Sequence, residues 1–138
     1  MKEDIAFAPV EGVSIAIVPD EAATTTEGQP GWLVYLLNYN DHELENVIVS
    51  SNGYGTNAEG EPVRTSTLRH SLLMVPEQAA VPVEPIDPAL FHLNNQYWVS
   101  YYVGGQIFDK KFIFVPDSIV AANLTPITLL DRSGVLHS

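Results

Sequence analysis

Hydrophobic and β-branched residues recur along the chain in short runs separated by turn residues, and the clearest case is segment 96–115. Two aromatic-rich runs flank Gly104 and Gly105 there, a pattern typical of a β-hairpin. The predicted pairs are Val103–Gln106, Tyr101–Phe108, Val99–Lys110 and Tyr97–Phe112. One face of this hairpin is mostly apolar. The face with Trp98 and Tyr102 is mixed, and could meet water, a ligand or a partner.

Five further segments have the composition of strands. They are 12–18, 32–39, 44–51, 63–75 and 79–86. In segment 32–39 apolar residues occupy both the odd and the even positions, which predicts a strand buried on both faces. Because of Pro82 and Pro85, segment 79–86 can be a strand only at the edge of a sheet or with interruptions. Segment 21–31 is rich in turn residues and is predicted to be a loop, and segment 52–62 is predicted to be a loop or a ragged hairpin tip.

Two short helices and an apolar tail complete the expected elements. Asp87-Pro88 has the chemistry of a helix start, and Asp117-Ser118 could cap a second short helix. The C-terminal extension 117–138 is too apolar for a free end, so we expect it to dock on its own sandwich or on another chain. The pattern predicts one all-β domain over residues 1–138: an immunoglobulin-like antiparallel β-sandwich of about seven strands with one or two short helices and a docked tail.

The charge balance narrows the classes of partner. The chain has 17 acidic and 6 basic residues, a formal net charge of −11, and the basic residues are scattered along the sequence. Nucleic-acid binding needs a clustered basic face, so we expect no nucleic-acid partner. No apolar stretch approaches the ~20 residues of a membrane span, and the N-terminus lacks a signal-peptide core. We therefore expect no membrane partner and a cytoplasmic location.

The sequence contains little that points to catalysis. It has no cysteine, no Gly-x-Ser-x-Gly, no Walker loop and no histidine pair at metal-ligand spacing. Asp41, His42 and Glu43 lie in the densest patch of possible metal ligands, but we interpret this patch as a solvated turn and expect no metal site, with a cation site as the alternative. We expect no catalytic residue, no cofactor and no enzymatic activity.

Two resemblances bear on the fold and the family. The run Leu36 to Val49 resembles the strand–turn–strand opening of immunoglobulin-like and fibronectin-type sandwiches, without their cysteine pair. The motifs Val10 to Val13, Thr65 to His70, Leu93 to Gln96 and Gly134 to Leu136 together resemble a family of short uncharacterised bacterial proteins. Some members carry a label as a phenylalanyl-tRNA synthetase subunit. Because no synthetase ATP-binding motif is present, the resemblance implies no catalytic residue here.

The function that these features favour is a non-enzymatic protein-interaction or self-assembly module, with a protein partner or a second copy of the chain. The candidate contact residues are Trp98, Tyr102, Leu129, Leu130 and Leu136. A small-ligand or carbohydrate binder that stacks its ligand on Trp98 and Tyr102 is the alternative. A hydrolase ranks third, because the sequence singles out no nucleophile.

Overall fold

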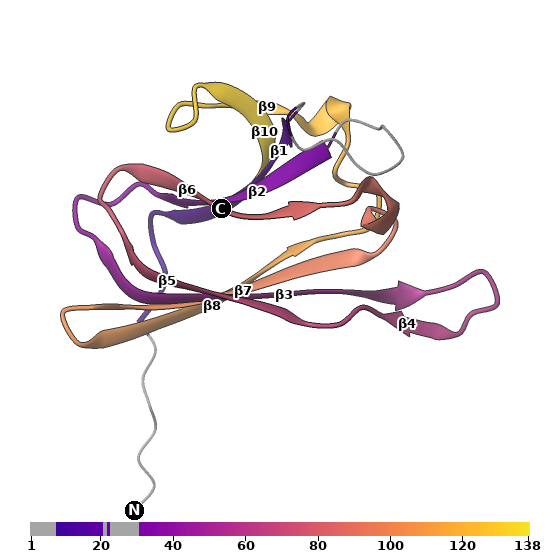
Figure 1. The fold of residues 1–138 in the computed structure, drawn as a ribbon, viewed down its shortest axis with the longest axis horizontal. Helices are drawn as coiled ribbons and strands as arrows, with labels where there is room; N and C mark the ends of the chain where they lie inside the picture. The colour runs from indigo at the N-terminus through magenta and orange to yellow at the C-terminus, as the bar shows by residue number, and fades with distance from the viewer. Residues whose placement is uncertain (1–7, 21, 23–30) are drawn as a thin grey trace, which may run out of the picture.

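Two antiparallel β-sheets pack face to face in the computed structural model, which describes residues 8–20, 22 and 31–138 (Figure 1). The first sheet contains, in order, β6 (Ala79–Ile86), β2 (Gly31–Asn38), β1 (Val13–Asp20), β10 (Arg132–His137) and β9 (Thr125–Ile127). The second contains β4 (Pro62–Arg64), β3 (Leu44–Thr56), β7 (Asn94–Val103) and β8 (Gln106–Phe114), and β5 (Leu68–Val75) pairs with β3 beside β4. The predicted all-β sandwich is confirmed.

The predicted hairpin is β7 and β8, and its register is confirmed. Val103 pairs with Gln106, and the pairing continues outward without a shift. Gly104 and Gly105 have φ values of 53° and 83°. A two-residue turn with two positive φ values matches the twist of the strands that it joins, and glycine adopts this conformation without a Cβ clash.

The main core lies between the sheets and follows the alternation of each strand. Tyr97, Val99 and Tyr101 of β7 point inward and are buried. The Tyr101 ring stacks on Phe108, with 5.0 Å between ring centres, and the Tyr97 ring meets Phe114 edge-on at 6.1 Å. Such pairs are worth about 0.5–1.5 kcal/mol beyond the area that they bury. The hairpin therefore supplies much of the aromatic core.

A second, smaller cluster explains why segment 32–39 is apolar at both parities. Leu36 of β2 faces the core between the sheets, whereas Leu37 faces outward into a cluster with Ala16, Val18 and Ile127. The C-terminal extension covers this outer surface of the first sheet (Figure 1). β10 also pairs with β1, so the extension docks on its own sandwich. The prediction of a strand buried on both faces is confirmed.

Several boundaries differ from the sequence-based expectation. The described residues form ten strands rather than about seven. Segment 63–75 is interrupted after β4, because the Thr65 hydroxyl accepts a hydrogen bond from the Gly53 N–H (2.8 Å) in place of a backbone carbonyl. Segment 52–62 is a hairpin tip, the second of the two predicted forms, since β3 runs to Thr56 and pairs there with Pro62 of β4. The glycine-rich end of β3 therefore forms strand hydrogen bonds that satisfy its backbone N–H and C=O groups.

The two helical predictions had different outcomes. The 3₁₀ turn η2 (Pro88–Leu90) begins as expected, with the Asp87 carboxylate accepting the Ala89 N–H. The second turn, η3 (Ala121–Asn123), starts later than Asp117-Ser118 and has no side-chain cap. Within the described residues no helix is long and apolar enough to cross a membrane. The predicted loop 21–31 lies mostly outside the described residues, which include only Ala22 and Gly31 of this segment, and Gly31 begins β2.

Candidate functional site

Four strand edges in the described part of the sandwich differ in how they are protected against pairing with another chain. An edge strand presents unpaired backbone N–H and C=O groups, and proteins block them with proline, charge or short length. β6 carries Pro82 and Pro85, as the sequence predicts. β9 has three residues including Pro126, and β8 carries Lys110 and Lys111. These three edges are therefore protected.

The fourth edge is β5, an eight-residue strand that pairs only with β3 in the described part of the chain. It contains no proline and no acidic residue, and the run Ser71–Val75 carries no charge. Leu73 is 85% exposed, and Leu68 and Met74 are about half exposed. We call this strand the β5 edge. It combines free backbone groups with exposed apolar side chains, which is the pattern that favours strand addition.

Trp98 and Tyr102 lie on the outer face of the second sheet, as predicted for the mixed face of the hairpin. They are 43% and 39% exposed. The Trp98 indole N–H donates to Asp109, and the Lys111 ammonium lies 4.6 Å from the centre of the Trp98 ring. Since Lys111 already occupies one face of the ring, a stacked sugar would need the other face or would have to displace the lysine.

Strand register gathers basic residues that look scattered in the sequence. Arg69 pairs with Ser50, Ser50 with Trp98, and Trp98 with Lys111, so these four residues form one row across the second sheet. The row has a cation at each end. In a chain with a net charge of −11, this part of the outer face is the less negative one.

The predicted contact residues of the tail separate into two groups. Leu129 and Leu130 are partly buried and pack on the outward cluster of the first sheet. Leu136 on β10 is partly exposed. Leu129 and Leu130 therefore stabilise the chain's own fold, and the structure does not bring the tail residues together with Trp98 or Tyr102.

The possible metal ligands Asp41, His42 and Glu43 lie in the exposed turn between β2 and β3. Asp41 accepts a hydrogen bond from the Gln78 side chain. Among the described residues, no group of three or more acidic or histidine side chains is arranged to hold a metal ion. The solvated-turn interpretation fits this geometry.

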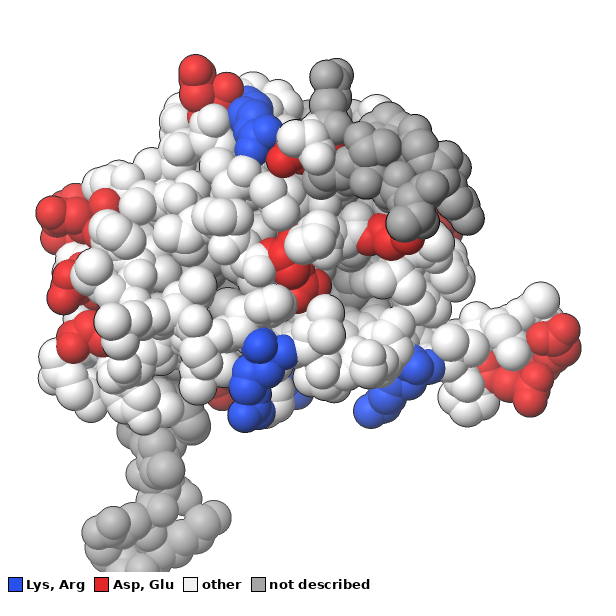
Figure 2. All heavy atoms as spheres, viewed as in Figure 1, with Lys and Arg blue, Asp and Glu red and all other residues white. Residues whose placement is uncertain are grey.

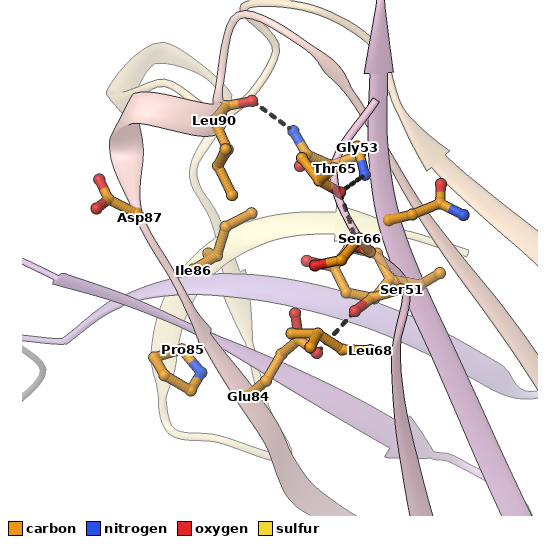
Figure 3. Close-up of a pocket in the computed structure, with 13 residues that line it drawn as sticks. Ser51, Gly53, Thr65, Ser66, Leu68, Glu84, Pro85, Ile86, Asp87 and Leu90 are labelled. Atoms are coloured by element: carbon orange, nitrogen blue, oxygen red, sulfur yellow. Dashed lines mark hydrogen bonds between the residues drawn. The ribbon is translucent and has the colours of Figure 1, made fainter. Parts of the chain in front are cut away.

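A cleft of about 580 Å³ opens between the two sheets near the start of β5 (Figure 3). Apolar side chains from β5, β6 and η2 line one part of it, and hydroxyl groups from β3 and the β4–β5 connection line another. Its residues include Leu68, Ile86, Leu90, Ser51, Thr65, Ser66, Glu84 and Tyr97. In Figure 2 acidic atoms lie in the hollow between the sheets. We call this feature the edge cleft.

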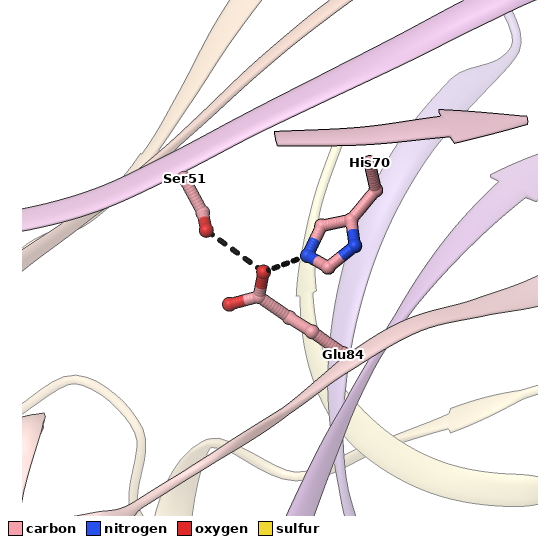
Figure 4. A network of polar contacts seen from close by, with 3 residues as sticks. All are labelled: Ser51, His70 and Glu84. Atoms are coloured by element: carbon pink, nitrogen blue, oxygen red, sulfur yellow. Dashed lines mark hydrogen bonds and ion pairs between the residues drawn. The ribbon is translucent and has the colours of Figure 1, made fainter. Parts of the chain in front are cut away.

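Glu84 connects three strands at one end of the edge cleft (Figure 4). Its Oε1 accepts the Ser51 hydroxyl at 2.8 Å and lies 2.6 Å from the His70 Nε2. The Glu84 side chain is only 9% exposed. Burying a carboxylate costs free energy unless hydrogen bonds replace the water that it loses. Ser51 and His70 supply that replacement at one oxygen.

The phenol of Tyr97 lies near Glu84 in the same buried surroundings, but belongs to the other sheet. Burial raises the pKa of Tyr97 far above its usual value of 10.0, and the negative charge of Glu84 raises it further. Tyr97 therefore stays neutral and is a hydrogen-bond donor or acceptor at ordinary pH. The wall of the edge cleft near Glu84 thus combines one carboxylate with neutral hydroxyl groups.

The network of Ser51, His70 and Glu84 differs from a nucleophile–base–acid arrangement. In that arrangement the histidine lies between the hydroxyl and the carboxylate and accepts the hydroxyl proton. Here the carboxylate lies between, and both Ser51 and His70 bind the same oxygen of Glu84. The geometry supports a binding or structural role for the network and gives no activated nucleophile.

Sequence reasoning missed Glu84 and its partners. Ser51 and Glu84 are 33 positions apart, and His70 and Glu84 are 14 apart. One signal was present, since Glu84 is the single charged residue in segment 79–86. No protein-family model matches the chain, and no curated protein matches it significantly. The family resemblance noted from the sequence stays a prediction.

Proposed function

We propose that this protein is a non-enzymatic self-assembly module in which a second copy of the chain adds to the β5 edge. The observation that carries the proposal is the contrast between edges: β6, β8 and β9 bear prolines, lysines or few residues, whereas β5 has eight residues with no proline and no acid. Pairing two such edges would satisfy backbone groups in both copies and join their second sheets.

The distribution of charged residues favours binding of the second copy at β5 rather than at other surfaces. Each chain carries a formal net charge of −11, so two copies repel each other. β5 holds no acidic residue and contributes Arg69. Contact along β5 therefore avoids placing carboxylates directly against carboxylates. A two-fold axis through the strand also makes the contact self-complementary, as in most homodimers.

The sequence of β5 selects one register for an antiparallel pair. An axis at Ser71 places the exposed Leu68 opposite Met74 of the other copy, and Arg69 opposite Leu73. The apolar side chains of each copy are then covered by the other copy. An axis shifted by one residue to Leu72 would leave Leu68 without a partner. We therefore place the axis at Ser71.

Absolute molar mass tests the proposal, measured by light scattering behind size exclusion over a range of concentrations. A chain of 15.1 kDa is expected to approach twice that mass as concentration rises. Leu73→Lys adds a charge at an exposed edge position, and we expect it to give a monomer with unchanged thermal stability. A wild-type chain that stays monomeric at all concentrations would refute the proposal.

Two matched variants test whether the interface lies at the β5 edge, at the tail, or at any exposed apolar residue. Leu136→Lys changes a candidate contact residue of the tail, and Val115→Lys changes an exposed apolar residue beyond β8. Both are expected to leave the dimer intact. A dimer that survives Leu73→Lys and dissociates with Leu136→Lys would move the interface to the C-terminal extension.

A further inference from the structure

The edge cleft has the properties of a small-ligand site, and it shares one lining residue, Leu68, with the β5 edge. Its volume of about 580 Å³ lies within the range of known ligand pockets, roughly 300–1,000 Å³. Ligand pockets are usually mostly apolar with a few polar groups that fix orientation. Leu68, Ile86 and Leu90 supply the apolar part here, and Glu84 lies at one end with hydroxyl groups beside it (Figure 3).

The chemistry of the expected ligand follows from Glu84. Ser51 and His70 both bind its Oε1, and within the described residues its Oε2 receives no hydrogen bond (Figure 4). The Glu84 side chain is 9% exposed, and Oε2 still reaches solvent, because every buried side-chain nitrogen or oxygen among the described residues has a hydrogen-bond partner. Because this oxygen has no partner within the fold, it can accept a hydrogen bond from a ligand, and a donor that carries positive charge is favoured, since such hydrogen bonds are about twice as strong as neutral ones.

The surrounding groups exclude other classes of ligand. Among the residues that the structure describes, no lysine or arginine lines the edge cleft, and Asp87 adds a second carboxylate at its boundary. An anion would therefore meet uncompensated negative charge. A purely apolar ligand would leave the Glu84 oxygen without a partner and remove its remaining water, which costs free energy. A cation with an apolar body avoids both costs.

We propose that the edge cleft binds a primary ammonium group on an apolar arm, with the ammonium donating to Glu84 and the arm against Leu68, Ile86 and Leu90. Ser51, Thr65 and Ser66 are placed on the cleft wall to bind further donors or acceptors of the ligand. The same chemistry exists in a free amine and in a lysine side chain of a peptide. The binding experiment distinguishes these sources.

The test uses the full chain and three probes: benzylammonium, blocked lysine (N-acetyl-lysine methylamide) and the neutral benzyl alcohol. Amide chemical shifts are followed by two-dimensional NMR during titration. We expect saturable shifts at residues of the edge cleft for at least one ammonium probe. Benzyl alcohol is expected to bind roughly tenfold to a hundredfold more weakly than benzylammonium, the value of one hydrogen bond to a charged group. The ammonium probe that binds more tightly shows whether the cleft prefers a free amine or the lysine side chain of a peptide.

Glu84→Gln keeps the shape and the acceptor for Ser51 while it removes the charge, and is expected to weaken ammonium binding by the same factor. Glu77→Gln, an exposed acid in the β5–β6 turn, is the charge-matched control and should not change affinity. Ser66→Phe fills the edge cleft without touching the Glu84 network, so it keeps the test valid if Glu84→Gln unfolds. Absence of saturable shifts with both ammonium probes, or equal affinity of wild type and Glu84→Gln, would overturn the proposal.

Discussion

Gly134 in β10 is the most demanding position in the docking of the C-terminal extension. A Cβ added there would lie 2.8 Å from Val18 Cγ2, 2.9 Å from Ile127 Cδ1 and 3.2 Å from the Ile17 carbonyl oxygen. The first two distances are shorter than real Cβ contacts, and the third involves backbone of the neighbouring strand, which cannot rotate away. Gly134→Ala therefore has to move β10 against β1.

Overpacking of this kind costs about 1–3 kcal/mol of unfolding free energy. For a chain of this length, 1 kcal/mol corresponds to roughly 3–4 °C in melting temperature, so Gly134→Ala should lower the midpoint by roughly 3–12 °C. Thermal unfolding followed by circular dichroism measures the change. Ser133→Ala is the matched control, because Ser133 is the exposed neighbour on the same strand. We expect its midpoint to stay within about 1 °C of wild type.

A Gly134→Ala midpoint equal to that of Ser133→Ala would refute the packing argument. It would mean that β10 does not press against β1 in solution, and that the extension is free to leave the first sheet. Loss of the extension should also expose the outward cluster around Leu37. Binding of a dye that detects exposed apolar surface would then increase, which gives a second measurement of the same event.

Three further predictions follow from other contacts. Asn38→Ala should lower the unfolding free energy by about 1–3 kcal/mol in denaturant titrations, because the buried Asn38 amide donates to the carbonyls of His42 and Pro76 and these would lose a partner. Burial raises the pKa of Tyr101 from 10.0 to about 12, so the unfolded chain releases this proton at a lower pH than the folded chain. The contribution of Tyr101 to the unfolding free energy is therefore complete below about pH 10 and falls as the pH rises toward about 12. Tyr101→Phe should reduce this loss of stability at high pH. Dimer formation should strengthen when salt is raised from about 0.02 to about 0.5 M, because salt screens the repulsion between two acidic chains; light scattering that shows weaker association in salt would contradict this.

Local sequence patterns were sufficient for the parts of the fold that short-range chemistry determines. The Gly104-Gly105 pair specifies the turn, and alternation on either side specifies the register of β7 and β8. The double parity of segment 32–39 also indicated burial on both faces. That pattern did not say what covers the second face, because the covering residues lie about 90 positions later in the chain.

The candidate site was harder to predict for the same reason. Ser51, His70 and Glu84 come from three strands, and only the pairing of β5 with β3 and the packing of β6 beneath them bring these side chains together. Prolines limited β6 to an edge position or to an interrupted strand. Nothing in the β5 sequence distinguishes an edge from an interior strand, since edge position is a property of the sheet rather than of the strand.

The most direct test of assembly through β5 is a single-cysteine cross-link, which the chain permits because it has no cysteine of its own. With the two-fold axis at Ser71, the two copies of this residue lie opposite each other, about 4.5–5.5 Å apart at Cα, within the range of a disulfide. Ser100→Cys, on the same sheet row beyond Ile48, is the control. The account predicts that mild oxidation converts Ser71→Cys, and not Ser100→Cys, to a covalent dimer; equal cross-linking of both variants, or none of either, would contradict it.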